Sequence, residues 1–124
     1  MIFRLRTSKK TMEIFDTLSK STNLKPFALS KLAIALSLKE DLQGLRFNTD
    51  SNGLDLNKQT ITGKYDVMYK CLVEQHCGRH LQDEEYFPQY IKAHIDRGAK
   101  LLQNEYRYGK DLISYLAGLE GKSI

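Results

Sequence analysis

Residues 1–38, MIFRLRTSKKTMEIFDTLSKSTNLKPFALSKLAIALSL, decide the fold of this chain. Their apolar residues first alternate and then recur at helical spacing, and Pro26 stands between two helical runs. Strands have a side-chain period of two and helices a period of 3.6. The stretch therefore predicts a strand, a helix, a turn and a second helix, which is the order of a ribbon–helix–helix-like unit.

The strand is expected at IFRLR, residues 2–6, where Phe3 and Leu5 fall on one face and Arg4 and Arg6 on the other. The apolar face indicates contact with a core. The two arginines are left facing solvent.

Sequence signals mark the start of both helices. Thr7 or Ser8 can cap the first helix, which is expected to continue to about Thr22, because a hydroxyl oxygen accepts a free N–H of the first turn. Pro26 suits the first position of the second helix, where its missing N–H leaves no bond unmade.

The second helix is apolar on nearly every side. Its large apolar residues surround the helix axis: Phe27, Leu29, Leu32, Ile34, Leu36 and Leu38. Such a helix has to be covered on more than one side. A chain of 124 residues forms a thin core, so a second copy of the chain is the expected cover.

The remaining sequence predicts an irregular segment followed by more helices. Residues 50–53, DSNG, are a turn signal that could close a hairpin between LRFN (45–48) and LDLN (54–57). Helices are then expected over about 64–80, about 83–108 and 110–119. The prediction is a mainly α fold, with a short N-terminal strand and about five helices, in a single domain over residues 1–124.

Basic residues are concentrated in the first quarter of the chain. Residues 1–31 hold seven basic residues against two acids, and the rest of the chain holds twelve against thirteen. This distribution indicates a surface that binds a polyanion. The candidate DNA-contacting residues are Arg4, Arg6, Lys9, Lys10, Lys20, Lys25 and Lys31.

Two interpretations of this basic segment stay open. A two-stranded ribbon that presents Arg4 and Arg6 fits the major groove of DNA. Alternatively, the arginines only protect an edge strand from aggregation. If the DNA surface lies elsewhere, the next candidates are Lys92, Lys100 and Arg107 on the long helix.

One group of residues resembles a metal site. His76 and His80 share a helix face with Cys77, whereas Cys71 falls on another face. A structural zinc site needs four ligands in a tetrahedral arrangement, and paired cysteine knuckles are absent. Neither a metal nor a cofactor is therefore expected, and a metal-dependent enzyme built on these residues is a minor alternative.

No signature of catalysis is visible. His94 lies on an apolar helix stripe and is interpreted as a core histidine, from which Asp96 and Arg97 are expected to face away. The chain has no glycine-rich phosphate loop and no supported nucleophile. We therefore expect a protein that is not an enzyme.

A cytoplasmic location is expected. No apolar run approaches the ~20 residues needed to cross a bilayer. Arg4 and Arg6 interrupt the N-terminal apolar stretch in a way that a secretory signal would not tolerate. The two cysteines make no disulfide framework.

Three stretches, LKPFALSKLAIALSL (24–38), TITGKYDVMY (60–69) and YIKAHIDRGAKLL (90–102), resemble the DndE family in their order and spacing. The resemblance covers about residues 1–103. DndE is the small subunit of the bacterial DNA phosphorothioation system, in which sulfur replaces a backbone oxygen of DNA. The residues from about 106 to 124 lie beyond the resemblance.

The resemblance implies a helical homo-tetramer that binds double-stranded DNA, with a preference for nicked duplex. It also implies two partner subunits, an ATP-pyrophosphatase-like sulfur-transfer subunit with an iron–sulfur cluster and an ATPase of the chromosome-maintenance type. The alternative from the residues is a ribbon–helix–helix repressor or antitoxin. A repressor would prefer one operator sequence, whereas an accessory subunit would bind mainly through phosphates.

Overall fold

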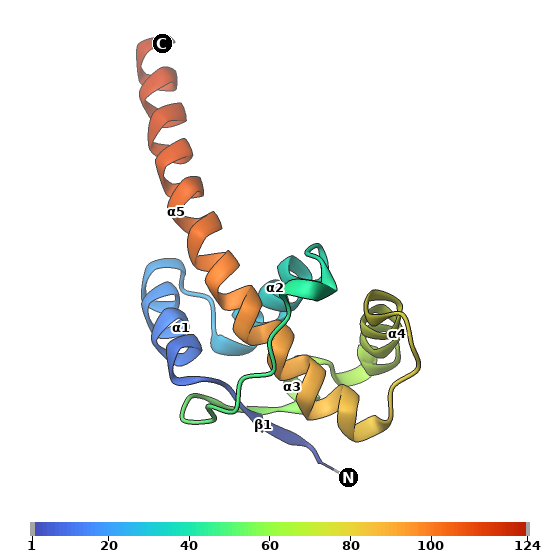
Figure 1. Cartoon of the computed structure of the whole chain (residues 1–124). Coiled ribbons are helices and arrows are strands. Elements are labelled where there is room, and N and C mark those ends of the chain that lie inside the picture. The colour runs from blue at the N-terminus through green and yellow to red at the C-terminus, as the bar shows by residue number, and fades with distance from the viewer. Residues whose placement is uncertain (1, 124) are drawn as a thin grey trace.

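The structure, a computed structural model, describes the backbone of residues 2–123 and the side chains of residues 2–107. Helices dominate it, as the sequence predicts (Figure 1). In chain order the elements are β1 (Arg4–Arg6), α1 (Lys9–Thr22), α2 (Pro26–Leu38), η1 (Leu42–Gly44), β2 (Asp55–Asn57), α3 (Lys58–Ile61), η2 (Gly63–Tyr65), α4 (Asp66–Cys77), η3 (Glu85–Tyr90) and α5 (Ile91–Ser123).

The N-terminal unit has the predicted order, but its ribbon is formed within one chain. β1 pairs antiparallel with β2, with Leu5 opposite Leu56, and both leucines are buried. The predicted hairpin between residues 45–48 and 54–57 is therefore wrong. The physical reason is that β1 presents a buried leucine opposite Leu56, which places the apolar residues of both strands on the core side.

The start of α1 confirms the predicted cap. The hydroxyl oxygen of Ser8 accepts the Thr11 N–H at 3.1 Å. The helix ends where Asn23 takes a left-handed conformation, with φ of 62°, and donates its N–H to Ser19. A short polar side chain makes asparagine one of the few residues that adopt this conformation readily.

The core forms where α2 and α5 pack against each other, with α1 also packed on α5. Leu29 and Ile34 of α2 are buried in this contact, whereas Phe27 and Leu32 on the same helix remain 40% and 44% exposed. The single chain thus covers only part of the helix that the sequence shows to be apolar all round.

Two predicted helices are divided differently in the structure. The helix expected over about 64–80 is α4 alone, preceded by the short segments α3 and η2. The helix expected from about 83 is broken at Phe87, which has extended φ and ψ of −128° and 118° because the following residue is Pro88.

The long helix α5 continues without interruption to Ser123, so the separate helix predicted over 110–119 is wrong. Gly109 costs about 1 kcal/mol in a helix interior relative to alanine, which is not enough to end it. Within the described residues, no helix has both the length and the apolar character needed to cross a membrane.

Candidate nucleic-acid interface

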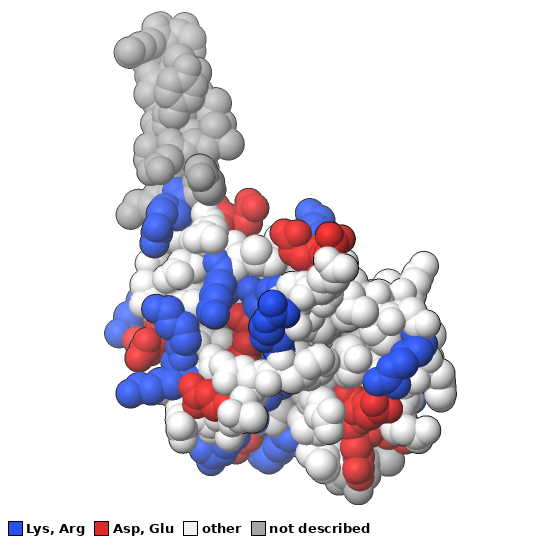
Figure 2. Space-filling view, viewed as in Figure 1, with Lys and Arg blue, Asp and Glu red and all other residues white. Residues whose placement is uncertain are grey.

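A basic cleft lies where the start of α1, residues 44–50 and α5 meet. Its volume is about 240 Å³. Figure 2 shows basic side chains gathered on the face where α1 and α5 lie side by side. The charged residues that line the basic cleft are Lys10, Arg46, Asp50, Asp96, Arg97 and Lys100.

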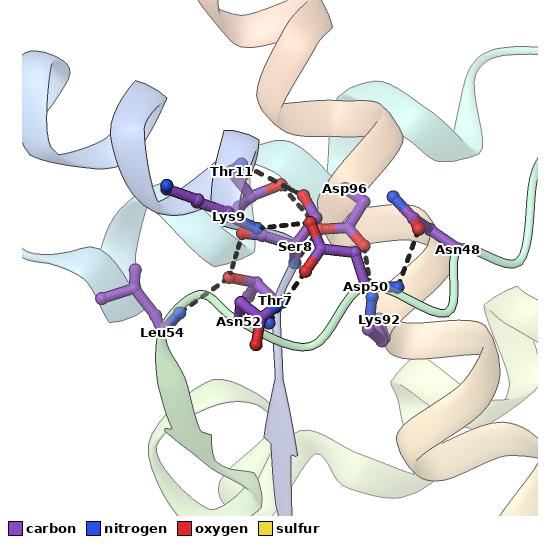
Figure 3. Close-up of polar contacts among 10 residues, drawn as sticks. All are labelled: Thr7, Ser8, Lys9, Thr11, Asn48, Asp50, Asn52, Leu54, Lys92 and Asp96. Carbon is purple, nitrogen blue, oxygen red and sulfur yellow. Dashed lines mark hydrogen bonds and ion pairs between the residues drawn. The ribbon is translucent and has the colours of Figure 1, made fainter.

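The carboxylate of Asp96 is fully engaged by its own chain. One oxygen accepts the Ser8 N–H at 3.1 Å and the Thr11 hydroxyl at 2.6 Å. The other oxygen pairs with the Lys92 ammonium group at 2.7 Å (Figure 3). A carboxylate is favoured at this place because the first N–H groups of a helix carry partial positive charge.

Asp50, in the irregular segment between η1 and β2, binds the same end of α1. Its carboxylate accepts the N–H groups of Lys9 at 3.1 Å and Asn52 at 2.9 Å (Figure 3). These hydrogen bonds stabilise the charged form and lower the pKa of Asp50 below its usual value. Both acids in the cleft are thus committed to stabilising the N-terminus of α1.

Three basic side chains of the basic cleft have no acidic partner in the part of the chain that the structure describes. Within the described residues, Lys10, Arg46 and Lys100 form no ion pair. Arg46 donates from Nη1 to the Gln43 carbonyl at 2.8 Å, which leaves its charge uncompensated. Three positive groups from distant parts of the sequence therefore converge on one cleft, and this arrangement suits an anion.

Arg97 supports the cleft rather than offering a free charge. Its guanidinium donates to the Ser37 hydroxyl and carbonyl and to the Asp41 carbonyl, at 2.6–2.8 Å. Ser37 lies in the last turn of α2, where carbonyls have no partners within the helix, and Asp41 lies in the segment that follows. Arg97 thereby ties α5 to the end of α2.

The structure disperses the other residues predicted to contact DNA. Arg4 and Arg6 are exposed on β1, where Arg4 pairs with Asp55 at 3.4 Å. Lys20 pairs with Asp16 at 3.1 Å near the end of α1.

Lys9, Lys25 and Lys31 lie at three further places. Lys9 is exposed in the first turn of α1, next to Lys10, and Lys25 is exposed before α2. Lys31 lines an apolar groove of about 290 Å³ between α2 and α4, and this groove shares no lining residue with the basic cleft. Of the seven predicted residues, only Lys10 lines the cleft.

The sequence analysis named Lys100 only among the alternative DNA-contacting residues, and it did not name Arg46. A signal for Lys100 was present, since Lys92, Asp96 and Lys100 are spaced by four residues and share one face of a helix. Nothing in the sequence marked Arg46, which lies in the irregular segment and reaches the cleft only because residues 44–50 pack beside α1 and α5.

A second hollow, the Phe47 pocket, adjoins the basic cleft. Its volume is about 230 Å³, and its lining includes Phe47, Asn48, Thr49, Pro88, Gln89 and Lys92. The Phe47 ring is 52% exposed, and it packs edge-on against the ring of Tyr90 with a centroid distance of 4.9 Å.

His94 is buried, as predicted, but it is not isolated from Arg97. Its Nδ1 lies 2.7 Å from the Ser37 hydroxyl, which also accepts a hydrogen bond from Arg97. Ser37 therefore bridges His94 and Arg97. Burial, with the charges of His76 and Arg97 nearby, lowers the pKa of His94 to about 3. The expectation that Arg97 faces away from His94 is wrong.

The residues of the metal-like group have separate partners. His76 Nε2 contacts the Glu40 carbonyl at 2.6 Å, His80 pairs with Glu74 at 2.6 Å, and the Cys77 thiol lies 3.5 Å from the Glu74 carbonyl. Among the residues that the structure describes, no three His, Cys, Asp or Glu side chains are placed to hold one metal ion.

A family model of the DNA sulphur modification protein DndE matches residues 4–110. The chain belongs to the DndE family. The match covers all the elements that form the basic cleft and the Phe47 pocket, and it ends within α5. No curated protein sequence matches the chain.

Solved DndE structures share the fold of this chain. The crystal structure of DndE from Escherichia coli B7A, described as involved in DNA phosphorothioation modification, has a TM-score of 0.63 at 19% sequence identity. The alignment covers 82% of this chain and 97% of that one. A crystal structure of a DndE mutant gives the same score and identity, covering 84% of this chain and 99% of the mutant. At this identity the likeness shows the fold alone.

Proposed function

We propose that this chain is a non-catalytic DNA-binding subunit of the DNA phosphorothioation machinery. The observation that carries the proposal is the convergence of Lys10, Arg46 and Lys100 on one cleft whose acids are already engaged. Lysine and arginine groups bind DNA mainly by replacing the counterions around its phosphates. Membership of the DndE family supplies the biological setting.

The proposed partners follow from the family. The chain would bind duplex DNA, with nicked duplex preferred, as a homo-tetramer in the cytoplasm. It would act beside an ATP-pyrophosphatase-like sulfur-transfer subunit, which carries the chemistry, and an ATPase subunit. The exposed apolar residues Phe27 and Leu32 on α2 support contact with another protein surface.

A binding assay on three DNAs of one sequence tests the proposal: nicked duplex, intact duplex and single strand. Affinity should fall steeply with salt, with a log–log slope near −0.9 per phosphate contact. The double variant Lys10→Ala, Lys100→Ala should weaken binding to every sequence and flatten this slope by about two, if each lysine meets one phosphate. Lys64→Ala, an exposed lysine stacked on Tyr65, is the matched control.

The same assay addresses the repressor alternative. A double variant of Arg4 and Arg6 would erase a preference for one sequence if these arginines read base edges. In an accessory subunit it should change only the overall affinity. An unaltered affinity and salt slope in the variant of Lys10 and Lys100 would place the DNA surface elsewhere, and absence of binding at low salt would refute the proposal.

A further inference from the structure

The basic cleft and the Phe47 pocket are neighbours on the surface. Asn48 belongs to the lining of both. Lys92 lines the Phe47 pocket, and its ammonium group pairs with Asp96, which lines the basic cleft, at 2.7 Å. The two hollows therefore meet at Asn48 and lie on either side of this ion pair.

The basic cleft has the chemistry of a phosphate site. Lys10, Arg46 and Lys100 contribute charges that no described carboxylate neutralises. Asp50 and Asp96 remain negatively charged, but Asp96 is paired with Lys92, and the cleft keeps a positive balance because its four basic residues outnumber the two acids. Lysine and arginine groups are the usual partners of phosphate oxygens.

The Phe47 pocket has the chemistry of a base-stacking site. Phe47 is half exposed, but its orientation is supported by the ring of Tyr90, which is only 9% exposed. An exposed aromatic ring beside a basic groove is the arrangement with which proteins bind unpaired bases, since every base has a face that can stack.

Asn48 adds a polar group at the boundary between the two hollows. Its side-chain oxygen accepts the Asp50 N–H at 2.9 Å, and its amide nitrogen points away from Asp50 (Figure 3). The amide N–H groups remain able to donate to a base edge or a phosphate. Gln89, which is exposed, provides a second amide in the lining of the Phe47 pocket.

We propose that the two hollows together bind one unpaired nucleotide of a DNA strand, with the phosphate in the basic cleft and the base against Phe47. A base inside a duplex has both faces covered by its neighbours, so only an unpaired base can use the pocket. This inference rests on the proposed DNA-binding function and adds a recognition of unpaired bases to it.

The test compares two labelled probes by fluorescence anisotropy: a fully paired duplex and the same duplex with one extra, unpaired thymine in one strand. The full chain should bind the second probe about tenfold more tightly, within the range for one stacked base. Phe47→Ala should reduce this ratio to about one and leave affinity for the paired duplex unchanged. Phe47→Tyr should keep the ratio, because tyrosine also stacks.

A matched control and a second variant separate the two halves of the site. Phe3→Ala removes a ring that is 57% exposed before β1, and it should leave the ratio unchanged. Lys100→Ala should weaken binding to both probes and flatten the salt slope by about one. If Lys100→Ala changes neither affinity nor slope, the placement of the phosphate in the basic cleft is overturned.

The failures of the two proposals can be told apart. A ratio near one in the unmodified chain, or a ratio that Phe47→Ala does not change, overturns the inference. Salt-dependent binding to the paired duplex would then still support the DNA-binding function. If neither probe binds at low salt, both proposals fail.

Discussion

Gly98 of α5 lies directly on the backbone of Ala33 in α2. A β-carbon at residue 98 would stand 1.8 Å from the Ala33 carbonyl oxygen, where no atom can fit. The contact sets how closely the two helices of the core approach, and through α5 it fixes the position of Asp96 and Lys100 in the basic cleft.

Gly98→Ala should therefore destabilise the protein. The new methyl group meets backbone rather than a flexible side chain, so α2 and α5 must separate, at a cost of about 1–3 kcal/mol or more. Thermal unfolding followed by circular dichroism measures the change. Gly44→Ala is the matched control, because its β-carbon would meet only the Arg97 side chain at 3.4 Å. Equal melting temperatures for the two variants would contradict the close contact.

Asp96→Asn should also lower stability, by about 1.5–3 kcal/mol. The carboxylate joins α5 to Ser8 and Thr11 at the start of α1, and hydrogen bonds to a charged group contribute about this much. Chemical denaturation measures the loss. Asp16→Asn breaks only an exposed pair with Lys20 and should change stability by less than about 1 kcal/mol. Similar losses in the two variants would argue against the buried role of Asp96.

The stability of the chain should depend on pH through His94. Its pKa is about 3 in the folded chain and near 6.5 when unfolded, so the unfolded state binds the extra proton between these values. The stabilisation is present above pH 6.5 and is lost as the pH falls toward 3. One proton gives a slope of about 1.4 kcal/mol per pH unit. Unfolding of His94→Gln across this range should lack that slope, and parallel curves for the two proteins would refute it.

Leu32→Glu should reduce self-association. Leu32 is 44% exposed on α2, so a single chain tolerates the charge, whereas an apolar interface between copies would not. Ile34 is unsuitable for this test because it is fully buried in its own chain. Analytical ultracentrifugation should show a lower mass for Leu32→Glu and no change for Ser21→Glu, on the exposed side of α1. An unchanged mass would place the interface away from Leu32.

Several local features could be predicted because short-range chemistry decides them. Ser8 caps α1 and Pro26 starts α2 through groups within a few residues of each other in the sequence. The break at Phe87 was also visible in principle, since a residue before proline avoids the helical conformation. The uninterrupted helix predicted from about residue 83 is therefore wrong for a reason that the sequence itself contains.

Long-range pairing decided what the sequence could not. β2 pairs with β1, about fifty residues earlier in the chain, and not with its neighbouring segment, because the match between Leu5 and Leu56 depends on where the core lies. For the same reason the sequence indicated where basic residues are concentrated but not which of them meet.

The sequence by itself determined a mainly helical chain of the DndE type, with a capped first helix, an apolar second helix and an excess of positive charge near its start. Only the tertiary structure decided that Lys10 joins Arg46 and Lys100 in one cleft. The physical reason is that the N-terminus of α1 favours a nearby negative charge, whereas its own first turn holds no acidic residue. Asp96, eighty-eight residues away from Ser8, supplies that charge and brings α5 to its place.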